Sequence, residues 1–465
     1  MIQHSLNLFF NPSSIAVIGA SRTPTKIGYE TLKNVLVSNY QGKVYPINPN
    51  ASHILGLKCY PSVLALPYDV DLALITVPAK FVPKVILECG KKGVQGAIII
   101  SSGFSEIGEN RLEDEVLETA QKHGMRILGP NTMGFKNATN SLDAAFVYGM
   151  PRKGSIALIS QSGALSIGMI HLANSELIGL SKVIGTGNKI DIDDADLIRY
   201  FSQDSATRVI ALYIEEIKNG KDFIEAVKHC HKPIVAIKAG KTKAGAKAIS
   251  SHTGAMAGSD KIYGSVFKQT GIIRAHDTVE LFDFTRALGS QPSSKGDHIG
   301  IVTNGGGAGI LLADACEENG LVVPPLTKKT YKRIDDVLPP LIHPSNPVDI
   351  VGDAGFYRYE MCSRALLEDS SIDALIITSV QAGYARPREF AGAIEKMIYE
   401  QHLHEEYDKP IIGCWIGGKE YEDLVIDLKR AGVPIYPSTT RAARAIWALV
   451  EQGKKSFRFS KKSKN

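Results

Sequence analysis

The sequence lacks clustered cysteines. Its six cysteines, in a chain of 465 residues, stand far apart and form no Cys-x-x-Cys pair. Zinc sites and redox centres are built from closely spaced cysteines, and most of these six lie in or beside apolar runs. We therefore expect reduced core residues rather than metal ligands or disulfides, which indicates a cytoplasmic protein.

Long apolar runs and an excess of one charge are also missing. No stretch approaches the roughly 18 charge-free apolar residues of a membrane-spanning helix, and no basic segment precedes an apolar core at the N-terminus. Lysine and arginine number 53 against 48 aspartate and glutamate, a net charge of +5. Such a balance gives no strong field toward nucleic acid or a membrane surface. The expected ligands are small molecules, with no nucleic acid and no membrane as partner.

The complete nucleotide-binding fingerprints are absent as well. The turn after the first apolar run reads Gly-Ala-Ser at residues 19–21, where a dinucleotide fold would carry G-x-G-x-x-G. The next strand ends in Asn48 and Pro49, not in the acidic residue that holds the ribose of NAD. The triplet Gly-Lys-Thr at residues 240–242 has no upstream glycine and is not a P-loop. NAD is disfavoured, and a tight turn that binds nothing remains an alternative for residues 19–21.

Short β-rich runs alternate with longer helical patterns along most of the chain. Glycine or proline marks the joints, which is typical of parallel βαβ architecture. The strands of the first block are continuously apolar, as a sheet covered on both faces requires. They are expected at residues 14–21, 43–49, 71–78, 96–104 and 126–132.

The rest of the chain contains an internal repeat. SIALISQSGA (155–164) parallels HIGIVTNGGGA (298–308), and KPIVAIKAG (232–240) parallels KPIIGCWIGG (409–418). An apolar strand stands between these markers in each copy, at residues 209–214 and 374–380.

The predicted fold class is therefore α/β, with a Rossmann-like domain followed by two flavodoxin-like domains. The expected domains are residues 1–150, 151–292 and 297–465. The Ser-, Gly- and Pro-rich segment 291–297 is the expected linker.

Polar and small residues gather at the ends of the strands of the first block. Ligands of open parallel sheets bind at this carboxyl edge, and small residues there let a phosphate approach a helix N-terminus. The candidate binding residues are Gly19, Ser21, Lys26, Asn48, Pro49, Val77, Pro78, Ser102, Gly103 and Asn131.

A second small-residue turn, Ser-Gln-Ser-Gly at residues 160–163, follows an apolar strand and precedes a helix. Backbone N–H groups converge at such a turn and the helix dipole assists, which predicts an anion site. A nucleophilic Ser162 is an alternative, although the turn lacks the first glycine of G-x-S-x-G.

A third candidate is His252, the one histidine of a Gly-, Ala-, Ser- and Lys-rich segment at residues 238–258, which we expect to be a loop. No neighbouring His or Cys completes a metal site. An imidazole nucleophile is chemically sensible there, with a carboxylate to steady the charged ring. Glu215, after the strand 209–214, is well placed for that, whereas Glu216 should point the opposite way if the strand continues. The alternatives are an exposed histidine without a role and a solvated strand-end acid.

Four motifs in this order carry a resemblance: GPNTMG (129–134), SQSGALS (160–166), YIEEI (213–217) and SSHTGAMAG (250–258). On these residues the chain resembles the α subunits of NDP-forming acyl-CoA synthetases, the family of succinyl-CoA synthetase. It is most similar to the ADP-forming acetate–CoA ligases, since its C-terminal domain resembles the additional flavodoxin-like domain of that branch. One departure is Glu216, where relatives commonly carry glycine.

The resemblance implies an enzyme that interconverts acyl-CoA, ADP and phosphate with acid, CoA and ATP, through an acyl phosphate and phosphorylated His252. It implies catalytic roles for His252 and Glu215 and CoA binding by the residues at the first carboxyl edge. The phosphate-binding residues that it implies are Gln161, Ser162, Gly163 and Gly187.

The resemblance also implies a partner. Three α/β domains use the whole length, so no ATP-grasp domain is expected in this chain. ADP or ATP, with Mg²⁺, would bind mainly in an ATP-grasp β subunit, in an α2β2 heterotetramer, and no metal site is expected here. One other function stays open, a scaffold that senses CoA or a nucleotide. A CoA-dependent protein acyltransferase is disfavoured, because the chain has no room for an acetyltransferase module. The acyl group, whether acetate, a branched acid or an aryl acid, is also open.

Overall fold

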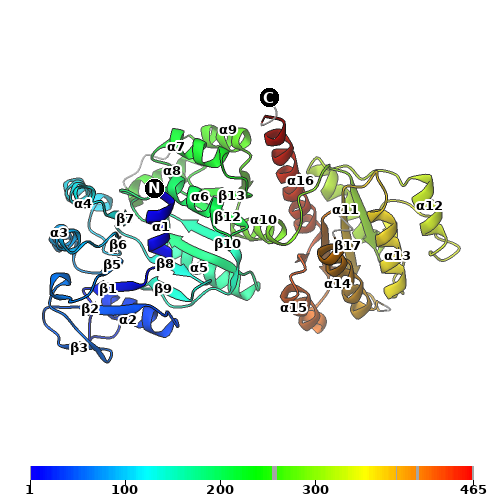
Figure 1. The fold of residues 1–465 in the computed structure, drawn as a ribbon. Coiled ribbons are helices and arrows are strands. Elements are labelled where there is room, and N and C mark those ends of the chain that lie inside the picture. Colours follow the sequence, from blue (N-terminus) through cyan, green and yellow to red (C-terminus); the bar gives the residue numbers. More distant parts are fainter. Residues whose placement is uncertain (1, 254–258, 384, 405–407, 463–465) are drawn as a thin grey trace. The chain divides into compact units, whose positions relative to one another are not determined.

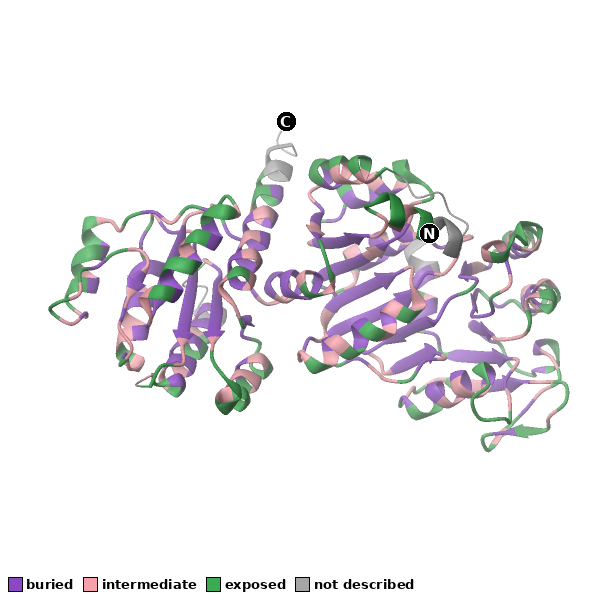
Figure 2. Ribbon diagram, turned by 180° about the vertical axis from the view of Figure 1, so that it is seen from behind, coloured by how far each residue is buried: buried purple, intermediate pink, exposed green. Residues whose placement is uncertain are grey.

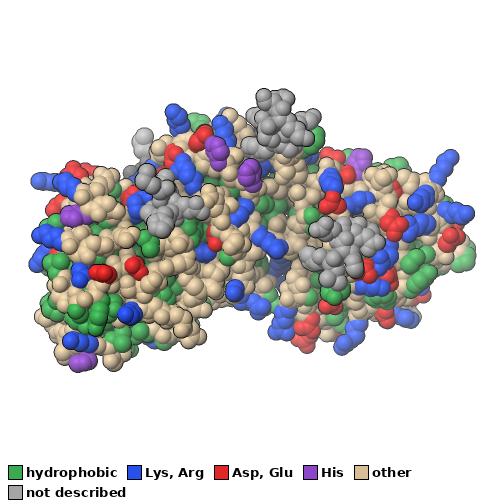
Figure 3. Space-filling view, viewed as in Figure 1, with side chains coloured by type: hydrophobic (Ala, Val, Ile, Leu, Met, Phe, Trp, Pro, Cys, Tyr) green, Lys and Arg blue, Asp and Glu red, His purple; other side chains and the backbone are tan. Residues whose placement is uncertain are grey.

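The computed structural model describes residues 2–253, 259–383, 385–404 and 408–462. The chain forms two compact units, Met1–His276 and Asp277–Asn465, which Figure 1 shows in ribbon form. Basic and acidic side chains are interspersed on the face seen in Figure 3, in keeping with the balanced composition. Among the described helices, none combines the length and the apolar character that crossing a bilayer would need.

The first unit begins with a helix and a parallel sheet. Helix α1 (Ile2–Phe10) precedes five strands in the order β2-β1-β5-β6-β7. The strands are β1 (Ser14–Ile18), β2 (Lys43–Ile47), β5 (Leu72–Ile75), β6 (Gly96–Ile99) and β7 (Arg126–Leu128), close to the predicted runs. Their residues are largely buried (Figure 2), as continuous apolar runs predict.

Helices and short segments connect these strands. The helices are α2 (Ile27–Val37), α3 (Val82–Lys92) and α4 (Asn110–Lys122), and the 3-10 turns are η1 (Val63–Ala65), η2 (Ala79–Phe81) and η3 (Ser105–Ile107). Strands β3 (His53–Ile54) and β4 (Leu57–Lys58) form a separate two-stranded sheet.

A hairpin that the sequence analysis did not predict leaves the first sheet for the second. Strands β8 (Gly134–Asn137) and β9 (Leu142–Ala145) pair with each other, and β8 pairs antiparallel with β11 (Leu180–Gly185). Inside the hairpin Lys136 Nζ lies 2.6 Å from Asp143 Oδ2, with side chains 0% and 5% exposed. The buried Lys136–Asp143 pair interrupts the apolar residues of these two strands, so the sequence pattern did not predict the hairpin.

The second sheet has the order β14-β13-β12-β10-β11-β8-β9. Its parallel strands are β10 (Lys153–Ser160), β11, β12 (Val209–Ile214), β13 (Ile234–Lys238) and β14 (Ile273–Ala275). The accompanying helices are α5 (Gly163–Ser175), α6 (Asp194–Gln203), α7 (Gly220–Lys228), α8 (Lys243–Thr253) and α9 (Asp260–Thr270). Strand order reverses between β10 and β12, so the turns after these two strands flank the ligand edge.

The segment 238–258 is not the loop that we expected. Residues Lys243–Thr253 form α8, and Gly245 N donates to Thr242 Oγ1 at 3.1 Å at its start. Alanine and lysine favour helix, which outweighs the single glycine of this helix, Gly245. Residues 254–258 lie outside the described residues.

The sheet of the second unit has the strand order β16-β15-β17-β18-β19. This is the same order as in the first sheet and among the parallel strands of the second sheet. Its strands are β15 (Ile299–Thr303), β16 (Val348–Asp349), β17 (Ala374–Val380), β18 (Ile411–Ile416) and β19 (Ile435–Tyr436). Its helices are α10 (Thr278–Ser290), α11 (Gly306–Glu318), α12 (Lys328–Asp335), α13 (Phe356–Leu367), α14 (Pro387–His404), α15 (Glu422–Arg430) and α16 (Thr439–Lys462), with the 3-10 turn η4 (Lys419–Tyr421). This architecture confirms the predicted α/β fold class.

Helix α10 packs on α16 of the second unit. The units divide between His276 and Asp277, whereas the sequence analysis placed this helix in the second of three domains, ending at residue 292.

Candidate active site

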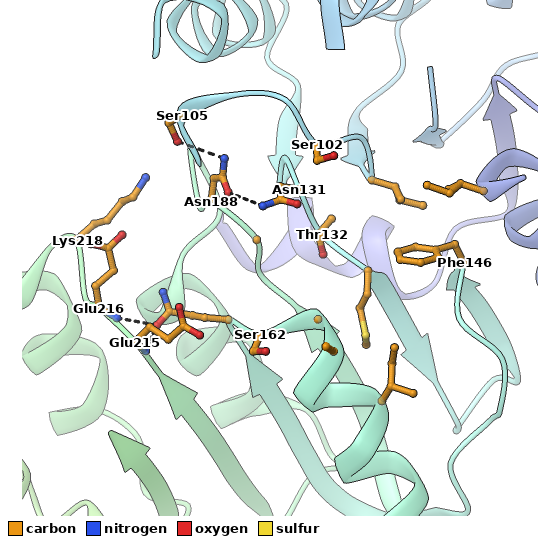
Figure 4. A pocket seen from close by; sticks show the side chains of 18 residues that line it. Ser102, Ser105, Asn131, Thr132, Phe146, Ser162, Asn188, Glu215, Glu216 and Lys218 are labelled. Carbon is orange, nitrogen blue, oxygen red and sulfur yellow. Dashed lines mark hydrogen bonds between the residues drawn. The ribbon is translucent and has the colours of Figure 1, made fainter. Parts of the chain in front are cut away.

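A pocket of about 430 Å³ opens in the first unit, where the ends of the two sheets face each other. Its lining comes from the loops after β6, β7, β10, β11 and β12, from the start of α5 and from residues near β8 and β9 (Figure 4). The lining residues are Ile27, Ile100, Ser102, Ser105, Asn131, Thr132, Met133, Phe146, Gln161, Ser162, Gly163, Ala164, Ile167, Gly187, Asn188, Glu215, Glu216 and Lys218.

The turn between β10 and α5 forms one wall of this pocket. Ser162 caps α5, its Oγ accepting from Leu165 N at 3.3 Å. Ser160 Oγ accepts from Ser162 N at 3.2 Å, which closes the turn. The first turn of a helix leaves N–H groups without intrahelical partners, and they favour an anion. The Ser162 hydroxyl serves as a cap, which argues against the nucleophile alternative.

Gln161 connects this turn to the two glutamates. Its Oε1 accepts from Glu215 N and, at 2.9 Å, from Glu216 N. Strand β12 ends at Ile214, so both glutamates follow the strand and both line the pocket. Strand alternation stops one residue before the pair, so the condition under which Glu216 would point away from Glu215 is not met.

Lys189 anchors the backbone of the same acidic segment. Its ammonium donates to Glu216 O at 2.8 Å and pairs with Asp194 Oδ2 at 2.7 Å. The side chains of Lys189 and Asp194 are 1% and 4% exposed. A charge buried so deeply has to be paired, and this pair fixes the backbone of the acidic segment.

Tyr263 and Lys238 complete the support of the acidic segment. Ile217 N donates to the Tyr263 hydroxyl at 3.1 Å, and Lys238 Nζ lies 4.6 Å from the centre of the Tyr263 ring. Burial lowers the pKa of Lys238 and raises that of Tyr263. Burial, followed by the charge of Glu215, raises the pKa of Tyr213.

Asn188 joins the loops of the two sheets above the pocket. Its Nδ2 donates to Glu106 Oε2 at 2.7 Å and to Glu113 Oε1 at 2.6 Å. Its Oδ1 accepts from Asn131 Nδ2 at 3.3 Å (Figure 4). Burial raises the pKa of Glu106, but hydrogen bonds from Gly103 N and Asn188 outweigh burial and lower it. The carboxylate therefore stays ionised and keeps the loop tethered.

Gly187 belongs to the same junction. Its φ is +58°, and a Cβ at this position would lie 2.1 Å from Pro130 O. Close backbone approach requires glycine here. Gly187 lines the pocket, as do the other three predicted phosphate ligands Gln161, Ser162 and Gly163.

The predicted CoA residues divide between this pocket and the edge beyond it. Ser102 and Asn131 line the pocket. The others lie at the carboxyl edge of the first sheet and are exposed or half-buried: Gly19, Ser21, Lys26, Asn48, Pro49, Val77, Pro78 and Gly103. Asn48 Nδ2 donates to Ala20 O at 2.7 Å and so ties the first turn to the second strand.

His252 is carried by helix α8, and its side chain lies outside the described residues. The helix itself lies beside η3, which contains the pocket residue Ser105. His252 is thus carried by a helix rather than by the expected loop, and this helix lies next to the turn that contains Ser105.

Sequence reasoning did not name Asn188 and Lys218, which line the pocket, or Lys189, which donates to the carbonyl of Glu216. A signal for two of them existed. Asn188 and Lys189 follow the run LSKVIG, which is strand β11, and residues at the carboxyl end of a parallel strand are candidates for a site. Strand β11 was not predicted, and of the residues after it only Gly187 was named, on the resemblance.

Three family descriptions match the chain in succession. They are a CoA binding domain at residues 13–138, a succinyl-CoA ligase like flavodoxin domain at residues 153–288 and a Ligase-CoA domain at residues 299–457.

Known proteins are similar over nearly the whole length. The α subunit of acetate–CoA ligase [ADP-forming] I of Pyrococcus furiosus is 43% identical over 97% of this chain and 98% of its own. An acetate–CoA ligase [ADP-forming] of Methanocaldococcus jannaschii is 41% identical over 95% of this chain, which spans 62% of that longer relative. A solved dinucleotide forming acetyl-coenzyme A synthetase 1 of Ca. Korarchaeum cryptofilum, in complex with phosphate and ADP, aligns with a TM-score of 0.93, 40% identity and 98% coverage of both chains. The chain belongs to the ADP-forming acetate–CoA ligases, as an α subunit of that family of ligases.

Proposed function

We propose that this chain binds CoA and phosphate and carries the phosphoryl group on His252, as the catalytic subunit of an ADP-forming acyl-CoA synthetase. One observation carries the proposal. A single pocket joins the anion-binding turn 160–163, the loops at the first carboxyl edge and the glutamates after β12, and it lies beside the helix that bears His252.

The proposed reaction has three steps. A phosphate oxygen attacks the thioester carbonyl of acyl-CoA, the C–S bond breaks, and the thiolate of CoA takes a proton. An imidazole nitrogen of His252 then attacks the phosphorus of the acyl phosphate and releases the acid as carboxylate. Finally the phosphoryl group passes from His252 to ADP, which gives ATP and free histidine.

The described residues suit the first two steps. The N–H groups at the start of α5 favour the phosphate and the developing charge on it. Glu215 is buried beside the turn and is the acid that we assign to the charged imidazole of His252. CoA would lie along the carboxyl edge of the first sheet with its thioester at Ser102 and Asn131.

The experiment is a labelling assay. Incubation of the chain with acetyl-CoA and radiolabelled phosphate should label His252 through an acid-labile bond. His252→Ala should remain unlabelled, while His229→Ala, at an exposed histidine after α7, should label as the unaltered chain does. Equal labelling of His252→Ala would rule the phosphohistidine out.

A partner subunit is implied by the names of the relatives as α subunits. We propose that it is an ATP-grasp β subunit in an α2β2 complex and that it holds ADP or ATP with Mg²⁺. Within the described residues, no group of three or more His, Cys, Asp or Glu could hold a metal ion. The longer relative carries chain beyond the region that this protein matches, which supports a second functional part.

This proposal is tested by calorimetry. The isolated chain should bind CoA but not Mg-ADP, and Mg-ADP binding should appear once the partner is added. Micromolar Mg-ADP binding by the isolated chain would refute the divided site. We further propose three domains, at residues 1–150, 151–292 and 297–465, and a cytoplasmic location, which the six buried cysteines, none of them in a disulfide, support.

A further inference from the structure

The pocket has an apolar end opposite its charged end. Its apolar side chains are Ile27, Ile100, Met133, Phe146, Ala164 and Ile167. The charged residues of its described lining are Glu215, Glu216 and Lys218, all just after β12. Figure 4 shows Phe146 on the side of the pocket away from Glu216 and Lys218.

We infer that Met133, Phe146 and Ile167 form the acyl subsite and that Phe146 sets the size limit of the acyl group. The inference rests on the proposed function. A thioester carbonyl attacked by phosphate at the turn 160–163 has to place its acyl chain beside that turn, where these three side chains lie. The substrate is thus a monocarboxylic acid with a hydrocarbon chain, since apolar surface binds apolar surface.

Met133 brings apolar surface directly to the phosphate turn. It is 2% exposed, and a Cβ built on Gly163 at the start of α5 would lie 3.7 Å from Met133 Cβ. On its other side, a Cβ built on Gly185 would lie 2.7 Å from Met133 Cγ. The side chain is wedged between α5 and the end of β11, so the first carbons of an acyl chain meet it.

Buried hydrogen bonds fix the backbone on both sides of Phe146. The amide of Asn34, on α2, donates to Ala145 O at 2.9 Å and to Val147 O at 3.2 Å. Asn34 is 3% exposed, and Phe146 N donates to Met133 O at 3.4 Å. These buried hydrogen bonds fix the backbone on either side of Phe146, so the Cα–Cβ bond that carries the ring has a defined direction.

Helix α5 supplies the facing wall. Ala164 and Ile167 are three residues apart and therefore share one face of the helix. The segment after Phe146 runs beside this helix, because Asn174 Nδ2 donates to Met150 O at 3.2 Å and Arg152 N donates to Asn174 Oδ1 at 3.0 Å. The small Ala164 leaves the space that larger acyl groups would use.

The charge distribution excludes a dicarboxylic acid from this subsite. A second carboxylate on the acyl chain would enter the apolar end, and the one cation of the described lining, Lys218, lies at the other end. Burying an unpaired carboxylate is strongly unfavourable. Succinyl-CoA should therefore be a poor substrate.

The test measures kcat/KM of the complete complex, with phosphate and ADP, for acetyl-, isobutyryl-, phenylacetyl- and succinyl-CoA. Phe146→Ala should raise the ratio of phenylacetyl- to acetyl-CoA by about tenfold or more. Ala164→Leu should lower the same ratio by a similar factor, which tests the subsite by filling it. Succinyl-CoA should fall at least about tenfold below isobutyryl-CoA in the unaltered protein.

Tyr148→Ala is the matched control, because Tyr148 is an aromatic residue of the same segment, is 79% exposed and does not line the pocket. It should leave all ratios unchanged. Unchanged ratios in Phe146→Ala and Ala164→Leu, or succinyl-CoA as the preferred substrate, would overturn the subsite.

The labelling assay separates this failure from failure of the proposed function. If His252 is labelled from acetyl-CoA while both variants keep the normal ratios, the acyl subsite alone is wrong. If no acyl-CoA leads to labelling of His252, the proposed function itself is wrong and the subsite with it.

Discussion

Glu215 and Glu216, just after β12, are the two candidates for the carboxylate that stabilises the charged imidazole of His252. The side-chain amide of Gln161 binds the backbone of both. Gln161 Oε1 accepts both of their backbone N–H groups, and Lys189 holds the carbonyl of Glu216. The buried Glu215 is enclosed by the protein, whereas Glu216 is half-buried. A carboxylate stabilises a nearby imidazolium more strongly where water is excluded, which favours Glu215.

We predict that Glu215→Gln slows phosphorylation of His252 by about 100-fold, because it removes the charge that steadies the imidazolium. CoA affinity should stay unchanged. Single-turnover labelling with acetyl-CoA and radiolabelled phosphate measures the rate, and calorimetry measures CoA binding. Glu216→Gln is the matched control and should have the smaller effect, so the opposite order would transfer the role to Glu216.

Seven residues that the sequence analysis named as site residues line the pocket: Ser102, Asn131, Gln161, Ser162, Gly163, Gly187 and Glu215. Most of them, such as Gln161 and Glu215, come soon after strands that are continuously apolar and therefore visible in the sequence. Phe146 and Met133 belong to the unpredicted hairpin region, and their neighbours in space are remote in sequence. Only the fold shows that they reach the same cavity.

At the scale of elements, the 3-10 turn η3 depends on an ionised carboxylate. Hydrogen bonds from Gly103 N and Asn188 hold the pKa of Glu106 below its usual 4.5 in spite of burial. A lowered pKa contributes stability that is present above the unfolded value and is lost as pH falls through the folded value.

We therefore predict that the difference in free energy of unfolding between the unaltered chain and Glu106→Gln is largest above about pH 4.5 and shrinks as the solution is acidified further. Urea unfolding at several pH values between about 3 and 6 measures it. Glu109→Gln, at an exposed neighbour, should change the unfolding free energy little across this range. A difference that stays constant with pH would show that Glu106 does not act through its charge.

Two glycines allow a matched test of the loop junction. Gly187→Ala should lower the free energy of unfolding by about 1–3 kcal/mol, because φ is +58° and the new Cβ would meet Pro130 O. Gly168→Ala, within α5 and with nothing near its built Cβ, should raise it by about 0.5–1 kcal/mol. Denaturant unfolding measures both, and a neutral Gly187→Ala would contradict the close approach of the two loops.

At the scale of the whole molecule, α10 decides where the second unit begins. Asp283 accepts two hydrogen bonds from Arg441, both 2.7 Å, and Tyr436 OH donates to Asp283 O at 2.9 Å. Phe284 and Leu281, on the same helix, are fully buried. Removing the helix would expose these apolar contacts and leave Tyr436 without its acceptor.

We predict that a fragment of residues 277–465 is at least about 3 kcal/mol more stable than a fragment of residues 297–465, since burying each large apolar side chain contributes about 1.5–3 kcal/mol. Thermal and urea unfolding of the two fragments make the comparison. Equal stabilities would place the boundary at the predicted linker 291–297 instead.

The internal repeat of the two flavodoxin-like blocks was the part of the fold that the sequence predicted best. The runs 209–214 and 374–380 are the strands β12 and β17 with the expected bounds. Short strands such as β16 and β19, of two residues each, and the hairpin β8–β9 left no periodic pattern to detect. Helix α8 was missed because its small residues were interpreted as a loop.

The hairpin β8–β9 has a practical consequence for chimeric enzymes. It lies before residue 150 in the chain, yet β8 pairs with β11 and β9 forms the edge of the second sheet, and Asn137 Nδ2 donates to the carbonyl of Phe10 on α1 at 2.9 Å. A graft that exchanged only residues 1–150 for those of a relative would import a foreign edge strand into a resident sheet. Exchanges that preserve folding should therefore take residues 1–276 as one block, so CoA preference and phosphate chemistry will be inherited together.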